Sequence, residues 1–176
     1  MTPSRRREIN EFAEQVRHAL DLRSPIDMER VVRTLGGSVK YTRPHELPYE
    51  AIVEKKDGSF VISLTRDKAP TRRNFSIAHE VGHLLLHMGY IVDPKKWEQI
   101  SNYEDSVRAR YGYSEEELEA NEFAGALLMP RDEFLKAAER HFDGEKYDVG
   151  KVAGHFGISS QAAKTRGQWL NVFAWD

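Results

Sequence analysis

The chain of 176 residues is 40% hydrophobic and 31% charged, a composition that supports a folded core and excludes a disordered or collagen-like chain. Its 26 basic and 28 acidic residues leave a net charge of −2, which disfavours direct nucleic-acid binding over a general basic surface. Cysteine is absent, so disulfides and thiolate ligands are excluded, and histidines and carboxylates must hold any metal ion.

Two amphipathic helices are predicted in residues 1–37. Residues 8–23 carry apolar side chains at helical spacing, which predicts a helix with one buried face. A second helix is expected to begin near Pro25, with Ser24 as its cap, and to end at Leu35 before a pair of glycines.

Beyond the second helix, the apolar spacing changes to the alternation typical of strands. Residues 50–65 predict a β-hairpin with its turn at Lys56–Ser59. With a further strand near Val39 and Tyr41, residues 38–66 are expected to form a small antiparallel sheet of about three strands. Because helices precede and follow this sheet, the predicted fold class is α+β and mostly helical.

Helical spacing returns in residues 70–142. The expected helices cover residues 73–87, packed beside the sheet, then a segment near 95–110 followed by a loop at Gly112, then Ser114–Met129, then a segment capped by Asp132. Residues 146–172 predict two short helices around Gly157–Ser159, in the manner of a helix-turn-helix. No segment rich in Pro, Gly or Ser divides the chain, so residues 1–176 are expected to form a single domain.

The sequence His-Glu-Val-Gly-His begins at His79, inside a predicted helix. His79 and His83 are about 40° apart around the helix axis on neighbouring turns, so both imidazoles can bind one metal ion. Glu80 points about 100° away from His79, where it can reach a water on that metal without being a ligand. The alternative is a solvated face that happens to carry these residues. Because the surrounding helix is apolar and expected to be buried, where unpaired His and Glu side chains are costly, the metal site is favoured.

His87 lies four residues beyond His83 and extends the same row. Each step of four residues adds a drift of about 40° around a regular helix and about 6 Å along its axis, so His87 is poorly placed as a third ligand. We expect it to support the site from outside or to pack near the helix end.

A carboxylate on the Ser114–Met129 helix is the candidate third ligand, because a catalytic zinc site usually has three protein ligands. Glu117 and Asn121 share one face of that helix, and an amide there can hold a ligating side chain in place. The spacing of Ser114 and Glu117 also fits a capping box, in which Glu117 would bond to the backbone of Ser114. Asn121 favours the ligand, since an Asn in the middle of a helix has little rationale from helix propensity.

Two segments resemble the motifs of the ImmA/IrrE family of metallopeptidases: Arg73–His87, with His-Glu-x-x-His, and Glu117–Pro130, with Glu-x-x-Ala-Asn. The resemblance implies a zinc-dependent endopeptidase of the gluzincin type, with His79, His83 and Glu117 as ligands, Glu80 as general base and Asn121 as a supporting residue. It also implies a protein substrate, since characterised relatives cleave helix-turn-helix transcriptional repressors in prophage, mobile-element or stress-response systems.

One zinc ion is the expected cofactor, although manganese also suits two imidazoles and a carboxylate. No apolar segment approaches the roughly 20 residues that span a bilayer. No apolar segment follows Arg5–Arg7 as it would in a secretory signal. A cytoplasmic protein without a membrane partner is therefore expected.

The strand that carries Phe60, Ile62 and Leu64 lies just before the metal-binding helix in the sequence. We expect this strand to bind an extended peptide substrate by β-addition. The group that stabilises the oxyanion stays open among Tyr103, Tyr111, Tyr113, His141 and His155.

Residues 149–170 leave a second interpretation open. As a DNA-binding helix-turn-helix, they would place Gln161, Lys164 and Arg166 at a groove. Basic residues are sparse here, which favours two helices that pack against the peptidase core. The alternative function is a DNA-binding or repressor-binding regulator with a non-catalytic zinc site.

Overall fold

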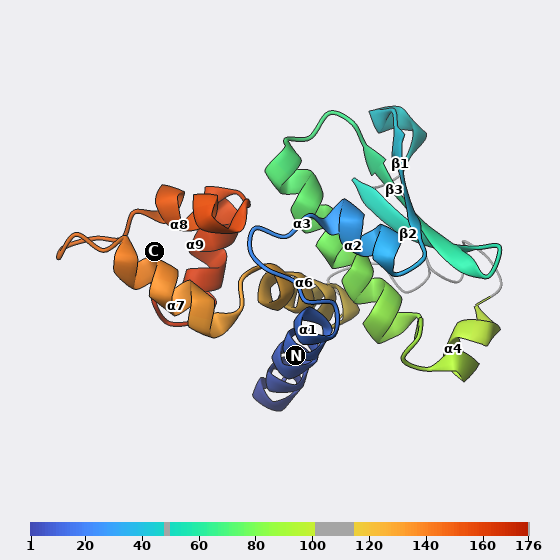
Figure 1. Cartoon of the computed structure of the whole chain (residues 1–176), viewed down its shortest axis with the longest axis horizontal. Helices are drawn as coiled ribbons and strands as arrows, with labels where there is room; N and C mark the ends of the chain where they lie inside the picture. Colours follow the sequence, from blue (N-terminus) through green and yellow to red (C-terminus); the bar gives the residue numbers. More distant parts are fainter. Residues whose placement is uncertain (48–49, 101–114, 176) are drawn as a thin grey trace.

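A central helix, α3 (Pro70–Gly82), lies between a small sheet on one side and helices α1 (Pro3–Ala19) and α6 (Glu115–Leu128) on the other, as Figure 1 shows. The structure is a computed structural model and describes residues 1–47, 50–100 and 115–175. Buried apolar side chains from the sheet and the helices around it form one core cluster. The predicted class, α+β and mostly helical with a small sheet beside the helix of the His-Glu-Val-Gly-His motif, is confirmed.

The sheet has the strand order β1-β3-β2, with β1 at Ser38–Thr42, β2 at Ala51–Lys56 and β3 at Ser59–Thr65. β2 and β3 form the expected antiparallel hairpin, but β1 pairs parallel to β3, so the sheet is mixed rather than wholly antiparallel. The chain reverses after β1, through the short 3-10 turn η1 (Pro44–Glu46), and again after β2. Two reversals make β3 run in the direction of β1. Apolar alternation predicts which face of a strand is buried, but it does not predict the neighbouring strand.

The second N-terminal helix, α2 (Met28–Thr34), begins later than predicted. Its cap is Asp27, whose carboxylate accepts a hydrogen bond from the backbone amide of Arg30 (3.1 Å). Ser24, the expected cap, instead donates its hydroxyl to Glu133 on a distant helix (3.1 Å). The Ser24 side chain, which the local sequence pattern predicted as the helix cap, therefore bonds to another helix instead. The first helix, α1, also begins and ends a few residues earlier than predicted.

The predicted helix over residues 73–87 is present and begins at Pro70, but its last turn has a different hydrogen-bond pattern. Residues His83–His87 form a π-helical turn, η2, in which the amide of Met88 donates to the carbonyl of His83 (2.9 Å). Such turns are rare and frequently lie at functional sites. The turn carries the second histidine of the motif.

Helix α4 (Pro94–Gln99) corresponds to the start of the helix predicted near 95–110. The rest of that prediction, the loop at Gly112 and the helix start at Ser114 lie outside the described residues. The next described helix, α6, ends at Leu128, close to the point where the following proline was expected to stop it.

Helices α7 (Arg131–Arg140), α8 (Val149–Phe156) and α9 (Ser160–Trp169) gather at one end of the molecule (Figure 1). Pro130, rather than Asp132, is the residue that precedes α7. α8 ends at Gly157, which has a φ of 64°, and the hydroxyl of Ser159 caps α9. The two helices therefore have the predicted helix-turn-helix connection.

A buried ion pair holds α9 against α6 and α1. The guanidinium of Arg166, whose side chain is 5% exposed, donates to Glu122 on α6 (3.0 Å) and to Asn10 on α1 (2.8 Å). The amide of Asn10 also donates to Glu122 (2.7 Å). Because both charges are largely removed from water, the loss of Glu122 would leave the guanidinium of Arg166 buried without a carboxylate partner.

We expect Glu122→Ala to lower the free energy of unfolding by about 3–5 kcal/mol, because Arg166 would stay buried without its carboxylate. Chemical denaturation followed by circular dichroism measures this change. Glu139→Ala, the same substitution at an exposed position on α7, is the matched control and should change little. An equally small effect in both variants would contradict the structural role of the buried pair.

Candidate active site

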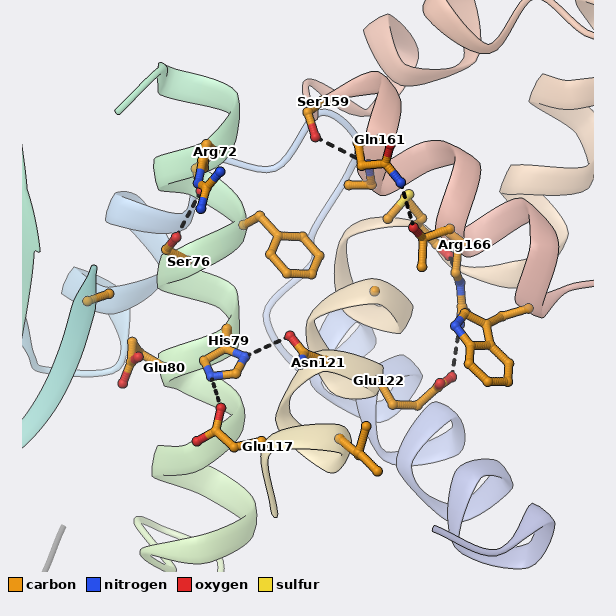
Figure 2. Close-up of a pocket in the computed structure, with 18 of the residues that line it drawn as sticks. Arg72, Ser76, His79, Glu80, Glu117, Asn121, Glu122, Ser159, Gln161 and Arg166 are labelled. Atoms are coloured by element: carbon orange, nitrogen blue, oxygen red, sulfur yellow. Dashed lines mark hydrogen bonds and ion pairs between the residues drawn. The ribbon is translucent and has the colours of Figure 1, made fainter. Parts of the chain in front are cut away.

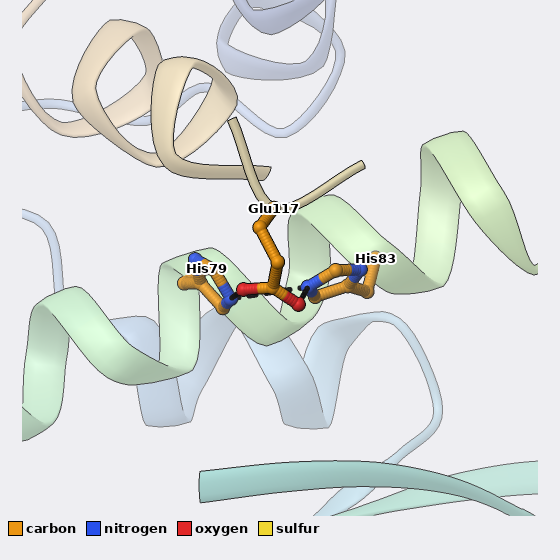
Figure 3. A group of neighbouring side chains, drawn as sticks. All are labelled: His79, His83 and Glu117. Atoms are coloured by element: carbon orange, nitrogen blue, oxygen red, sulfur yellow. Dashed lines mark hydrogen bonds and ion pairs between the residues drawn. The ribbon is translucent and has the colours of Figure 1, made fainter. Parts of the chain in front are cut away.

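Two histidines and a glutamate meet where α3 contacts α6. The Nε2 atoms of His79 and His83 lie 3.0 Å apart. Glu117 brings one carboxylate oxygen to 3.3 Å from Nε2 of His79 and the other to 3.1 Å from Nε2 of His83. Figure 3 shows the carboxylate between the two rings. The three candidate ligand atoms all lie within 4.8 Å of one another, a spacing that suits one metal ion.

Gly82 allows α6 to approach α3 closely enough for this meeting. A Cβ atom at Gly82 would lie 3.1 Å from the Cα of Ala120 and 3.2 Å from the ring of Phe123, which is tighter than ordinary van der Waals contact. Ala120 is small and fully buried. The small residues at this contact therefore set how near Glu117, three residues before Ala120, comes to the two histidines.

Asn121 orients the ring of His79. Its side-chain oxygen lies 3.0 Å from Nδ1 of His79, so Nδ1 donates the hydrogen bond and a neutral ring has its lone pair on Nε2. Figure 2 shows Asn121 and Glu117 on opposite sides of the His79 ring. Outer hydrogen bonds of this kind fix the tautomer and the orientation of imidazoles that bind metals. The capping alternative for Glu117 involves Ser114, which lies outside the described residues.

The charges of the cluster favour a cation. Burial opposes the protonation of His79, but the carboxylates of Glu117 and Glu80 outweigh it and raise the pKa of His79 above its ordinary value. Burial likewise opposes ionisation of Glu117, but hydrogen bonds from His79 and His83 outweigh it, so the pKa of Glu117 is well below its ordinary value. Positive charge is thus stabilised among these side chains. A divalent cation supplies such a charge, and two imidazoles with one carboxylate are a donor set that zinc accepts.

Glu80 lies on a neighbouring face of the same helix and is 3% exposed. In Figure 2 it points toward the sheet, whereas His79 points toward α6. Glu80 lines the same cavity as His79 and Glu117. Glu80 therefore borders the cleft but contributes no atom to the cluster of candidate ligands.

His87 lies behind His83. Its Nδ1 atom is 3.0 Å from Nδ1 of His83, and its Nε2 atom is 3.2 Å from a carboxylate oxygen of Glu119. Burial, together with the nearby His83, lowers the pKa of His87 to about 4. His87 therefore contacts a candidate ligand from outside, as the sequence suggested, and does not join the three ligand atoms.

Two of the three candidate ligands, His79 and Glu117, border a cleft of about 860 Å³. Its walls include Phe75 on α3, Leu118 on α6, and Thr165 and Trp169 on α9. The sheet contributes Ala51, the first residue of β2, to the lining of the cleft. The volume falls within the range of pockets that bind organic ligands.

The predicted substrate strand is not available to a peptide, which corrects the expectation for Phe60, Ile62 and Leu64. β3 is paired on both sides, by β1 and by β2, and each of these three side chains is at most 1% exposed. A peptide that adds to a sheet needs an unpaired edge. Within the described sheet, β2 is an edge strand and contributes Ala51 to the cleft lining.

The polar face of α9 borders the cleft. Gln161 and Thr165 are among the lining residues, and Arg166 is buried in its ion pair. Of the three residues that the DNA-binding interpretation requires at a groove, one is therefore held in the interior and another belongs to the cleft wall. These positions favour the interpretation in which α8 and α9 pack against the rest of the domain.

The cleft walls were not predicted from the sequence. Thr165 and Trp169 belong to no motif, and they border the cleft only because α9 packs against α6. No sequence pattern singles out Trp169; in the structure it is 46% exposed, although tryptophan is usually well buried.

Of the five candidates for stabilising the oxyanion, Tyr103, Tyr111 and Tyr113 lie outside the described residues. His141 and His155 do not line the cleft. His155 instead bonds to Glu133 (2.9 Å).

A helix with the His-Glu-Val-Gly-His motif, a carboxylate from a following helix and an adjoining cleft define a metallopeptidase-like domain. The model of the Peptidase M78 family, described as the IrrE N-terminal-like domain, matches residues 31–167, and the chain belongs to this family. The family expected from the two motifs is thereby confirmed.

Among solved structures, the chain is similar to a Mycobacterium tuberculosis transcriptional regulator, with a TM-score of 0.60 and 25% sequence identity. The match covers 91% of this chain and 46% of that one, so the chain spans less than half the length of this relative. No curated protein matches the sequence. Among the described residues, no helix combines the length and the apolar character that crossing a membrane requires.

We expect Glu117→Gln to weaken zinc binding by more than the roughly 10–100-fold typical of an outer supporting residue, because the substitution removes the charged member of the ligand set. Competition with a chromogenic chelator measures the affinity. Glu115→Gln makes the same change two residues away, at a side chain that is 76% exposed, and should bind zinc like the wild type. Unchanged affinity in Glu117→Gln would remove Glu117 from the ligand set.

Proposed function

We propose that the chain is a zinc-dependent endopeptidase that hydrolyses a peptide bond in a helix-turn-helix transcriptional repressor. The observation that carries this proposal is the convergence of His79, His83 and Glu117 beside a cleft that Glu80 also lines. Membership of a peptidase family supports it. Three protein ligands are the number found in catalytic zinc sites, which keep a further position for water or substrate.

The chemistry divides between the metal and the protein. Zinc held by these three side chains supplies Lewis acidity, which acidifies water and polarises a peptide carbonyl. Glu80 acts as the general base, so that its carboxylate takes a proton from water and passes it to the leaving amine nitrogen. Asn121 keeps Nε2 of His79 directed at the cation by accepting a hydrogen bond from the Nδ1–H group of that ring.

An extended peptide segment is the proposed form of the substrate at the site. On one side of the cleft, the edge strand β2 offers backbone groups next to Ala51. On the other side, α9 offers Thr165 and Trp169. A segment that lies between these walls passes His79, Glu80 and Glu117.

A repressor substrate is supported by relatives. The ImmA/IrrE resemblance implies it, and the similar solved structure carries the name of a transcriptional regulator. On this proposal, the chain acts in the cytoplasm as part of a prophage, mobile-element or stress-response system. This step rests on analogy between family members and not on the chemistry of the site.

We expect Glu80→Gln to keep the fold and the bound zinc but to lose at least about 100-fold in cleavage rate, because the amide cannot accept the proton from water. Cleavage of a purified repressor encoded next to this chain, followed by gel electrophoresis, measures the rate. Circular dichroism and metal analysis of the same sample verify the fold and the metal content. Undiminished cleavage by this variant would show that Glu80 is not the base.

The same assay distinguishes cleavage from binding alone. Wild-type protein should cut the repressor with zinc present and stop when a chelator is added. Stable association with an intact repressor, unaffected by the chelator, would support a regulator with a non-catalytic metal site instead.

A large side chain placed in the cleft tests whether the peptide binds there. We expect Thr165→Trp to lower kcat/KM at least about tenfold while zinc affinity stays unchanged, because the larger side chain occupies space that the peptide needs. Ser160→Trp places the same side chain at an exposed position of α9 that does not line the cleft, and it should leave kcat/KM unchanged. Equal activities of the two variants would exclude α9 as a substrate wall.

A further inference from the structure

A chain of hydrogen bonds runs from His83 to the N-terminal helix. Nδ1 of His83 lies 3.0 Å from Nδ1 of His87, and Nε2 of His87 lies 3.2 Å from an oxygen of Glu119 on α6. Arg5 on α1 then donates to both oxygens of Glu119, from Nε (2.8 Å) and from Nη2 (2.7 Å). Four side chains from three separate segments are thus joined in one line that ends at a candidate metal ligand.

The direction of each hydrogen bond follows from the role of His83. If Nε2 of His83 binds the cation, the proton of the neutral ring is on Nδ1, which must donate to Nδ1 of His87. His87 then carries its own proton on Nε2 and donates it to Glu119. Glu119 accepts this bond together with the two from Arg5. Every donor in the line meets an acceptor.

These hydrogen bonds matter for the tautomer of His83 because the side chains that form them are buried. The side chains of His83, His87 and Glu119 are 3%, 8% and 12% exposed, so water cannot readily replace a missing partner. A buried imidazole N–H without an acceptor costs free energy. His83 therefore keeps the tautomer that frees Nε2 only while an acceptor stays beside its Nδ1.

The π-helical turn brings His87 into this position. Because the amide of Met88 donates to His83, five residues earlier, the turn is wider than in an α-helix and the two side chains take a different angular offset. The drift that a regular helix imposes at this spacing does not apply here. The ring centroids of His83 and His87 are 5.0 Å apart, close enough for the Nδ1 contact.

We propose that His87, backed by Glu119 and Arg5, is a positioning residue that holds the proton of His83 on Nδ1 and so directs Nε2 of His83 to the metal ion. The proposal rests on the proposed metal site and adds the residues that support its second ligand. His87 accepts a hydrogen bond from Nδ1 of His83, as Asn121 does from Nδ1 of His79. His87 differs in that it also donates to Glu119 on α6, which in turn bonds to Arg5 on α1.

Zinc affinity, measured by chelator competition, tests the proposal without reference to peptidase activity. We expect His87→Leu to bind zinc about 10–100-fold more weakly than the wild type, because Nδ1 of His83 loses its acceptor. His87→Asn offers a side-chain oxygen at the position of Nδ1 and should restore most of the affinity. His155→Leu removes a histidine that also bonds to a glutamate (2.9 Å) but does not line the cleft, and it should bind zinc like the wild type.

The state of the rings provides a second measurement that needs no variant to fold. Long-range proton–nitrogen NMR spectra of the zinc-loaded wild type should show His83 protonated at Nδ1 and His87 protonated at Nε2. The opposite tautomer of His87, or a ring protonated at both nitrogens at neutral pH, would overturn the proposal.

The outcomes separate this proposal from the proposed function. Equal zinc affinities of wild type and His87→Leu would overturn the positioning role and leave the peptidase intact. Equal losses in His87→Leu and His87→Asn would assign His87 to packing alone, which also overturns the proposal. Zinc binding with no cleavage of any repressor would overturn the proposed function and leave the positioning role standing. A wild type that binds no zinc would overturn both.

Discussion

The close contact between α3 and α6 is the constraint on which the site depends. Gly82 meets Ala120 there with no room for a Cβ atom at the glycine, and Glu117 lies one helical turn before Ala120. A wider separation of the two helices would leave two histidines on one helix and a carboxylate out of their range. The motif by itself supplies only the pair of imidazoles. The small residues between the helices allow a carboxylate to join that pair, which gives three candidate ligand atoms.

α6 does more than supply the third candidate ligand. Its first two turns carry Glu117, Glu119 and Asn121, and each contacts a histidine of the motif helix or its π-helical continuation. The orientation of both rings is therefore set from a single neighbouring element. This arrangement gives a role to Asn121, which lies among alanines, and to Glu119, because each bonds to an imidazole. Helix propensity accounts for neither residue, whereas the hydrogen bonds of the imidazoles account for both.

Local patterns predicted the parts of the structure whose causes are local. The spacing of His79, Glu80 and His83 follows from helix geometry, and Glu117 with Asn121 followed from the face they share. Properties that depend on distant segments were not predicted. Whether the strand of Phe60 is central or at an edge depends on where β1 docks, and the alternation of its residues is the same in either case. The burial of Arg166 depends on Glu122 and Asn10, which are far away in the sequence.

Helix α1 lies before the segment that the family model matches, but it bonds to residues within that segment. The family model starts at residue 31, yet Arg5 and Asn10 lie before that point and bond to Glu119 and to Glu122 with Arg166. The segment that the family model matches is thus shorter than the part of the chain that these hydrogen bonds join. A fragment that began at residue 31 would lack Arg5, which bonds to Glu119 behind His87, and Asn10, which bonds to Arg166 on α9. Fragments for biochemical work should therefore keep the chain from Pro3 onward.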